Sequence, residues 1–324
     1  MCRYYIILYL QANYLPTISD RFNIKIEARH TNRKAVFIMA SFNVYQAVTD
    51  RIIAQLEKGV VPWHKPWGGV IGGAFNRVSK KPYSMLNQML LEHSGEYATF
   101  NQWKNLGGKI KKGAKSEIVV FWKIFDKEEE NNGKVEIKHI PCLRYFNVFH
   151  ISQVEGVEPL EQNIVEHEPI EEAETIKNAY AAREGLEIRE IATNDAFYSP
   201  LGDYIQVPCR KQYQDVAEFY ATLFHEMTHS TGIKNRLNRF NADAKIAKFG
   251  SADYSKEELI AELGSSMLMN HVGIENTTTF QNSAAYIKSW LGVLKGDNRF
   301  IVSASSKAEK AAKYILFGKD NNEA

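Results

Sequence analysis

The chain has 324 residues, a formal charge of +2, 44% hydrophobic residues and 24% charged residues. These values exclude a disordered chain, a coiled coil, a collagen-like repeat and a multi-span membrane protein, and they favour about two soluble domains. The three cysteines form no CxxC pair, so we expect reduced thiols rather than a disulfide framework or a cysteine-rich zinc site.

The near-neutral total conceals charged segments. Residues 40–150 carry 16 Lys and Arg against 10 Asp and Glu, a net charge of +6, whereas residues 151–200 carry 3 against 12, a net charge of −9. Such asymmetry hints at nucleic-acid contact. We predict a first domain over residues 39–150, an acidic linker over residues 151–178 and a second domain over residues 179–319.

The first 38 residues are basic and show no clear period, and a regular helical pattern begins only after Met39. The apolar run near the N-terminus is too short to cross a membrane and makes a poor signal peptide. We therefore expect residues 1–38 to lie upstream of the functional start.

The first domain is predicted to mix helix and strands. Its periodicity predicts an amphipathic helix over residues 43–58, then strands over residues 117–125, 135–140 and 144–150, with a hairpin loop over residues 126–133. This pattern is typical of an α+β fold.

Lysines alternate with aromatic residues in this first domain. Cations that contact phosphates and rings that stack on bases are the usual means of binding single-stranded nucleic acid. The alternative is that the aromatics form the core and the lysines a solvated surface. The candidate contacts are Trp63, Trp67, Lys80, Lys81, Tyr83, Trp103, Lys109, Lys111, Lys112 and Lys115.

The second domain contains an HExxH motif, His225-Glu226-Met227-Thr228-His229. A helix over residues 214–231, with Gly232 as its C-cap, would place both histidines on one face, away from the apolar sector. This spacing predicts a site for Zn²⁺ or another divalent transition metal. In the mechanism it implies, zinc lowers the pKa of its bound water towards about 7, and Glu226 passes a proton from that water to the leaving amine.

A third ligand is expected from a helix over residues 255–270, with Ser255 as N-cap. Glu258 and Glu262 share one face of this helix, whereas Glu257 lies about 100° away. We predict Glu258 as the metal ligand and Glu262 as its supporting carboxylate. The reverse assignment, and two exposed carboxylates without a metal role, remain alternatives.

Two further features flank this site. Residues 196–208 have strand character, and zincin folds place an edge strand beside the active helix, where it can pair with an extended peptide. His271 is either a spare ligand, an oxyanion helper or, more simply, a surface histidine.

Several segments together resemble the ArdC antirestriction proteins of conjugative plasmids and related mobile elements. They are VPWHKPW (61–67), NQWKNLGGKIKKGAKS (101–116), YFNVFHISQVEG (145–156), ATLFHEMTHSTG (221–232), YSKEELIAELGSSML (254–268) and the tail over 286–316. The resemblance implies an N-terminal domain that binds single-stranded DNA and a C-terminal zincin-like metallopeptidase domain. It implies His225, His229 and Glu258 as metal ligands and Glu226 as catalytic base.

The resemblance also implies a cytoplasmic protein, without a membrane partner, that protects incoming plasmid DNA from restriction enzymes. Its peptidase would act on a protein substrate such as a restriction component. Two alternatives remain: a regulatory zinc endopeptidase that uses DNA only as a scaffold, and a DNA-binding protector whose zinc site is structural.

Overall fold

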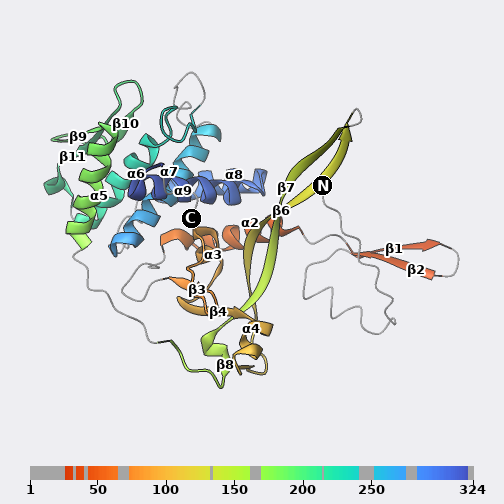
Figure 1. The fold of residues 1–324 in the computed structure, drawn as a ribbon. Helices are drawn as coiled ribbons and strands as arrows, with labels where there is room; N and C mark the ends of the chain where they lie inside the picture. The colour runs from red at the N-terminus through yellow and green to blue at the C-terminus, as the bar shows by residue number, and fades with distance from the viewer. Residues whose placement is uncertain are drawn as a thin grey trace. The chain divides into compact units, whose positions relative to one another are not determined.

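The computed structural model describes residues 26–31, 34–39, 43–64, 73–131, 134–160, 169–213, 215–240, 252–274 and 283–319, so Trp67 lies outside the described residues. The chain divides into two compact units, one made of residues 1–47 and 121–144 and the other of residues 48–120 and 145–324. Helices and strands are mixed throughout (Figure 1), which confirms the predicted α+β class.

The first unit contains an antiparallel hairpin of β1 (Ile26–Thr31) and β2 (Lys34–Met39), in which Ile26 lies opposite Met39. Part of the region predicted as an upstream extension is therefore a strand pair. The unit also holds the outer part of a second, longer ribbon formed by β6 (Glu117–Asn131) and β7 (Lys134–His150).

The predicted hairpin loop over residues 126–133 is too long, because β6 continues to Asn131 and its neighbour β7 begins at Lys134. The two separate strands predicted over residues 135–140 and 144–150 are likewise one strand, β7. Backbone hydrogen bonds hold a strand ladder together whatever its side chains, so the charged run DKEEE does not end β6. Pro141 lies within β7, away from residues 148–150, which pair with β4 (Gly95–Thr99).

Helix α2 (Val44–Leu56) confirms the predicted first helix. Its residues from Val48 onward belong to the second unit. Val48, Ile52 and Leu56 form its buried stripe at helical spacing. A four-stranded sheet follows in the order β3-β4-β7-β6, with β3 parallel to β4 and β4 antiparallel to β7. The remaining elements of this part are β3 (Ala74–Asn76), α3 (Met85–Leu90), β4 (Gly95–Thr99), α4 (Phe100–Asn105), β5 (Lys109–Ile110) and β8 (Val154–Glu155).

The C-terminal part is mainly helical. A three-stranded sheet in the order β10-β11-β9 packs against α6, and α6 packs against α7, which packs against α9. The predicted strand region over residues 196–208 forms two strands, of which β11 lies in the centre of this sheet and β10 lies at one of its two edges. The elements are α5 (Pro169–Glu184), β9 (Glu187–Ile191), β10 (Phe197–Ser199), β11 (Tyr204–Pro208), α6 (Val216–Ser230), α7 (Ala252–Val272), α8 (Ser283–Gly296) and α9 (Phe300–Phe317).

Helix α6 is fixed by the core on one side. Asp215 caps its N-terminus through a 2.9 Å hydrogen bond from the Ala217 amide, and Phe219, Leu223 and Met227 are fully buried. Its C-cap is Thr231 rather than Gly232. A Cβ at position 232 would lie 2.5 Å from the Phe240 ring, so this glycine allows close packing instead of ending the helix.

The N-terminal part of the second unit packs directly on the C-terminal helices. The Trp63 ring meets Trp290 of α8 edge-on, with 5.2 Å between centroids, and the Ser266 hydroxyl of α7 donates to the Trp63 carbonyl, 203 residues away in sequence. The Thr49 hydroxyl donates to the Asn298 carbonyl at 2.8 Å. Residues 48–64 and helices α7 to α9 therefore share one packed structure.

The predicted linker over residues 151–178 contains ordered structure. Strand β8 pairs with β5, with Val154 opposite Ile110, and α5 begins at Pro169. None of the described helices is long and apolar enough to cross a membrane.

Candidate metal centre and nucleic-acid contacts

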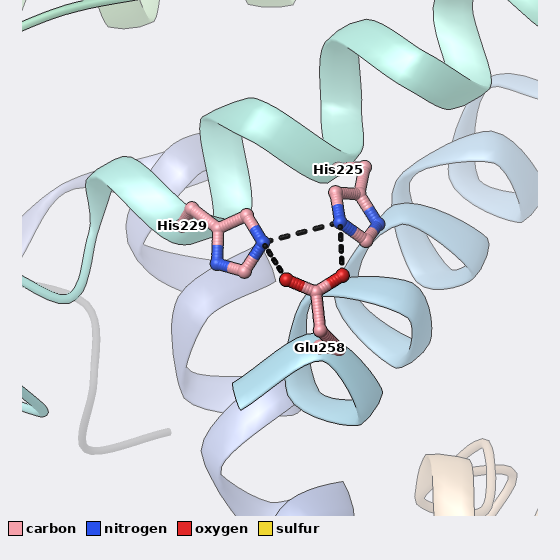
Figure 2. Close-up of side chains that lie close together, drawn as sticks. All are labelled: His225, His229 and Glu258. Atoms are coloured by element: carbon pink, nitrogen blue, oxygen red, sulfur yellow. Dashed lines mark hydrogen bonds and ion pairs between the residues drawn. The ribbon is translucent and has the colours of Figure 1, made fainter. Parts of the chain in front are cut away.

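Three side chains from two helices converge on one point. His225 and His229 are one turn apart on α6, and Glu258 reaches them from α7 (Figure 2). The two Nε2 atoms are 3.1 Å apart, and the Glu258 oxygens lie 3.5 Å from Nε2 of His225 and 3.4 Å from Nε2 of His229. All three ligand atoms lie within 4.8 Å of one another, which makes this the one group among the described residues that could hold a metal ion.

The other ring nitrogen of each histidine faces a second carboxylate. Nδ1 of His225 is 3.6 Å from Glu262, and Nδ1 of His229 is 3.5 Å from Glu257. A carboxylate at the outer nitrogen fixes the orientation of an imidazole ring and leaves Nε2 for a metal ion. The arrangement thus supplies each histidine with one carboxylate on the metal side, Glu258, and one on the outer side.

Glu257 is the residue that the sequence pattern did not single out. It lies beside His229, and Arg239 clamps it with contacts of 2.6 Å and 3.3 Å. Burial alone would raise the pKa of Glu257, but the hydrogen bonds and charges of His229 and Arg239 lower it below its usual value. Arg239 follows α6 in the sequence and is basic, which could have suggested it as a partner for a carboxylate. No spacing rule, however, relates Arg239 to Glu257 on α7.

Helices α6 and α7 approach closely because of Gly264. A Cβ at this position would lie 2.5 Å from Cγ2 of Thr228. The Ser265 hydroxyl also donates to the Ala221 carbonyl at 2.7 Å. Glycine in a helix interior costs about 1 kcal/mol of stability relative to alanine, and here it allows Glu258 to reach the histidines.

Helix α7 begins earlier than predicted. Its first residue is Ala252, so Ser255 lies inside the helix and is not its N-cap. The capping pattern was misleading because the residues before Ser255 also take up helical conformation. His271 is exposed in the last turn of α7, and 13 residues of helix place it about 20 Å along the axis from Glu258.

The histidines and carboxylates of this group shift one another's pKa. Burial alone would lower the pKa of His229, but hydrogen bonds to Glu257 and Glu258 raise it to about 9. Burial would likewise lower the pKa of His225, and contacts with Glu258 and Glu262 raise it well above the usual value. Burial would raise the pKa of Glu258, yet the two imidazoles hold it far below its usual value. A metal ion that binds here must displace these protons.

Glu226 lies between the two histidines in sequence and is 8% exposed. Its charge contributes to the raised pKa of both histidines. The side chains of His225, His229 and Glu258 are 20%, 13% and 11% exposed, so all three are largely buried but retain some contact with solvent.

The side chains predicted to contact nucleic acid fall into two groups, exposed lysines and buried aromatic rings. The lysines lie at the surface, at positions Lys80, Lys81, Lys109, Lys111, Lys112 and Lys115.

Trp63 and Trp103 are fully buried and Tyr83 is 7% exposed, so the prediction that these three rings stack on bases is wrong. They belong to the core because each packs against distant segments; the indole N–H of Trp103, for example, donates to the Phe149 carbonyl at 2.8 Å. Among the residues whose burial is described, the large exposed aromatic side chains are instead Phe100, Phe121, Trp122, Tyr145, Phe146 and Phe317.

Comparison with known proteins gives the family. Residues 42–149 match the N-terminal domain of anti-restriction factor ArdC, and residues 173–307 match a zincin-like metallopeptidase. The metal-free crystal structure of the antirestriction protein ArdC from the R388 plasmid is 36% identical, with a TM-score of 0.67, covering 85% of this chain and 97% of that one. The chain belongs to the ArdC family.

Other ArdC-like relatives extend this picture. The Mn(II)-bound structure of the R388 ArdC protein is 35% identical over 87% of this chain and all of that chain, with a TM-score of 0.67. The protein y4eC of Sinorhizobium fredii is 34% identical over 291 residues, 84% of this chain and 91% of that protein. A DNA primase TraC of Escherichia coli is 32% identical over 295 residues, but this chain spans only 27% of its length.

Proposed function

We propose that this ArdC-family chain protects the DNA of a mobile element, such as a conjugative plasmid, from restriction enzymes. In this proposal it binds single-stranded DNA through its N-terminal region, carries a metal-dependent peptidase centre in its zincin-like region and acts in the cytoplasm. The observation that carries the peptidase part is the convergence of His225, His229 and Glu258 on one point (Figure 2), with Glu226 following His225 in α6.

The donor set fits a divalent transition metal ion. Separations of 3.1 to 3.5 Å between the nitrogen and oxygen atoms suit ligands around one ion whose bonds are about 2.0–2.2 Å long. Two imidazoles and one carboxylate match Zn²⁺ and also Mn²⁺. We propose His225, His229 and Glu258 as the ligands, and Glu257 and Glu262 as the carboxylates that orient the two histidines.

Three protein ligands leave room for substrate, which favours a catalytic site over a structural one with four protein ligands. A bound ion would supply Lewis acidity to a water molecule and to the scissile carbonyl group. Glu226 accepts a proton from the water on its carboxylate as the water oxygen attacks the carbonyl carbon. It then donates this proton to the amine nitrogen as the carbon–nitrogen bond breaks.

The proposal that the chain binds DNA is supported by its membership of the ArdC family and by the exposed lysines of its N-terminal region. Phosphates attract such lysines, and the affinity for single strands then falls as salt rises. Unpaired bases also expose ring faces that duplex DNA hides, so we expect tighter binding to single than to double strands.

The test uses the purified full chain and the variant Glu226→Gln. The wild type should bind one Zn²⁺ or Mn²⁺ per chain in metal analysis and cleave casein or a restriction component. The variant should keep its metal and its affinity for oligo(dT) but lose cleavage. The variant Glu258→Ala should lose the metal itself. Absence of stoichiometric metal in the wild type, or cleavage by Glu226→Gln, would refute the peptidase centre.

Conjugation into a restricting host tests the biological role. The wild type should raise the yield of uncut plasmid relative to the same plasmid without the gene. If Glu226→Gln protects as well as the wild type, the peptidase is dispensable for protection. If neither protects, the antirestriction proposal is wrong.

A further inference from the structure

The rings that can stack on bases lie on a different element from those that the sequence pattern favoured. Base stacking needs a ring face that the solvent reaches. In the first unit, Phe121 of β6 is 45% exposed and Trp122 is 51% exposed. Both lie at the first residues of β6 that belong to this unit, and we call this end of the β6–β7 ribbon, residues 121–125 and 140–144, its base.

Strand geometry separates these two rings. Side chains alternate along a strand, so Phe121, Lys123 and Phe125 share one face of β6, and Trp122 lies on the opposite face. The guanidinium carbon of Arg144 in β7 is 5.1 Å from the Phe125 ring centroid, and Lys123 Nζ is 5.3 Å from it. We call Phe121, Lys123, Phe125 and Arg144 the hairpin-base face.

Charge is also favourable at this face. Residues 121–125 and 140–144 contain Lys123 and Arg144 and no Asp or Glu, whereas residues 126–139 contain five Asp and Glu against three Lys. An anionic chain is therefore attracted to the base of the ribbon and repelled from its outer part. The aromatic rings and the cations coincide within the attractive segment.

We propose that the hairpin-base face binds single-stranded DNA, with an unpaired base stacked on Phe121 and the neighbouring phosphates held by Lys123 and Arg144, the two cations that flank the Phe125 ring. The inference rests on the proposed DNA-binding function and names the surface that carries it. Trp122 on the opposite face packs edge-on against Tyr45, with 6.3 Å between centroids, and does not take part.

The experiment measures the affinity of the full chain for fluorescein-labelled oligo(dT) by anisotropy over a series of salt concentrations. Phe121→Ala should weaken binding about fivefold or more, the loss expected for one stacked base. Phe121→Tyr keeps a ring and should retain the wild-type affinity. Arg144→Gln should reduce the slope of log affinity against log salt by about 0.7, the contribution of one phosphate contact to a single strand.

Two variants serve as matched controls. Trp122→Ala removes an equally exposed ring from the opposite face and should bind oligo(dT) as the wild type does. Phe121→Leu keeps apolar bulk without a π face and should lose affinity as Phe121→Ala does. Circular dichroism and thermal unfolding show whether each variant is folded, and the Phe121→Leu variant keeps the test valid if the alanine variant is not.

The outcomes distinguish this inference from the proposed function. If the wild type does not bind oligo(dT), DNA binding itself is refuted, and this inference with it. If the wild type binds but Phe121→Ala and Arg144→Gln bind equally well, only the hairpin-base face is refuted. It is also refuted if Phe121→Leu retains full affinity, or if Phe121→Ala changes only the oligomeric state, which would assign the face to a second copy of the chain.

Discussion

The proposed metal centre (His225, His229 and Glu258) and the exposed lysines of the N-terminal region differ in how their polar side chains are surrounded. At the metal cluster, each polar group is enclosed and faces a partner: His229 lies between Glu257 and Glu258, and Arg239 fixes Glu257 from behind. On the lysine-rich surface, side chains such as Lys109 and Lys112 are exposed, and the nearby large rings, such as Trp103, are buried.

This difference indicates how each region would bind its ligand. Packing between α6 and α7 places the donors of the proposed metal centre. The exposed lysines would attract phosphates but add little geometry, since exposed ion pairs are weak and are screened by salt. Selective recognition of DNA then needs rigid, exposed rings elsewhere on the surface.

The largest expected effect concerns a buried ring. Trp63→Ala should lower the free energy of unfolding by about 3–5 kcal/mol, because it leaves a cavity against Trp290 and α7. Urea titration measures the change. Val60→Ala is the control, since Val60 is 43% exposed and its loss should change stability by less than about 0.5 kcal/mol. An unchanged Trp63→Ala midpoint would mean that this ring is not part of the core.

The close approach of α6 and α7 can be tested with a single methyl group. Gly264→Ala should destabilise the chain by about 1–3 kcal/mol and weaken metal binding, because the new Cβ would overlap Thr228. Gly292→Ala in α8 is the matched control: nothing lies within 4 Å of its Cβ, so it should stabilise the chain by about 0.5–1 kcal/mol. Thermal unfolding and dye-competition metal titration provide both readouts. Equal effects at the two glycines would contradict the packing argument.

The carboxylate behind His229 should matter less than a direct ligand. Glu257→Gln should weaken Zn²⁺ or Mn²⁺ binding about 10–100-fold, because the amide orients the imidazole less strongly. Glu187→Gln, at an exposed carboxylate paired with Arg189, should leave metal affinity unchanged. Isothermal titration of the metal into the apo chain measures both. A wild-type affinity in Glu257→Gln would remove Glu257 from the centre.

The smallest effect is expected at the surface lysines. Lys111→Gln and Lys112→Gln should each change the unfolding free energy by less than about 0.5 kcal/mol. Each should reduce the salt slope of oligo(dT) binding by about 0.7 if it contacts a phosphate. Lys295→Gln on α8, where the lysine pairs with Glu57 at 2.8 Å, is the control and should leave the slope unchanged. Salt slopes that stay at the wild-type value for both lysines would exclude this surface from the DNA contact.

Local sequence patterns were sufficient to predict helices α2 and α6. The positions of Val48, Ile52 and Leu56 predicted α2, and the spacing of His225 and His229 placed both rings on one face of α6, because helical geometry depends only on neighbours three or four residues away. Spacing placed Glu258 and Glu262 on one face of α7 and left the reverse assignment of the two open; in the structure Glu258 is the carboxylate that lies near both Nε2 atoms.

Tertiary packing decided which rings are covered and which remain open. Composition shows that aromatic and basic residues alternate, but whether Trp63 is buried depends on α7 and α8, more than 200 residues along the chain. The same is true of Glu257, whose partner Arg239 belongs to another element. The sequence by itself determined the histidine pair, because that pair is local; the structure decided the enclosure of the metal cluster and the exposure of Phe121, because burial is set by segments that meet only in the folded chain.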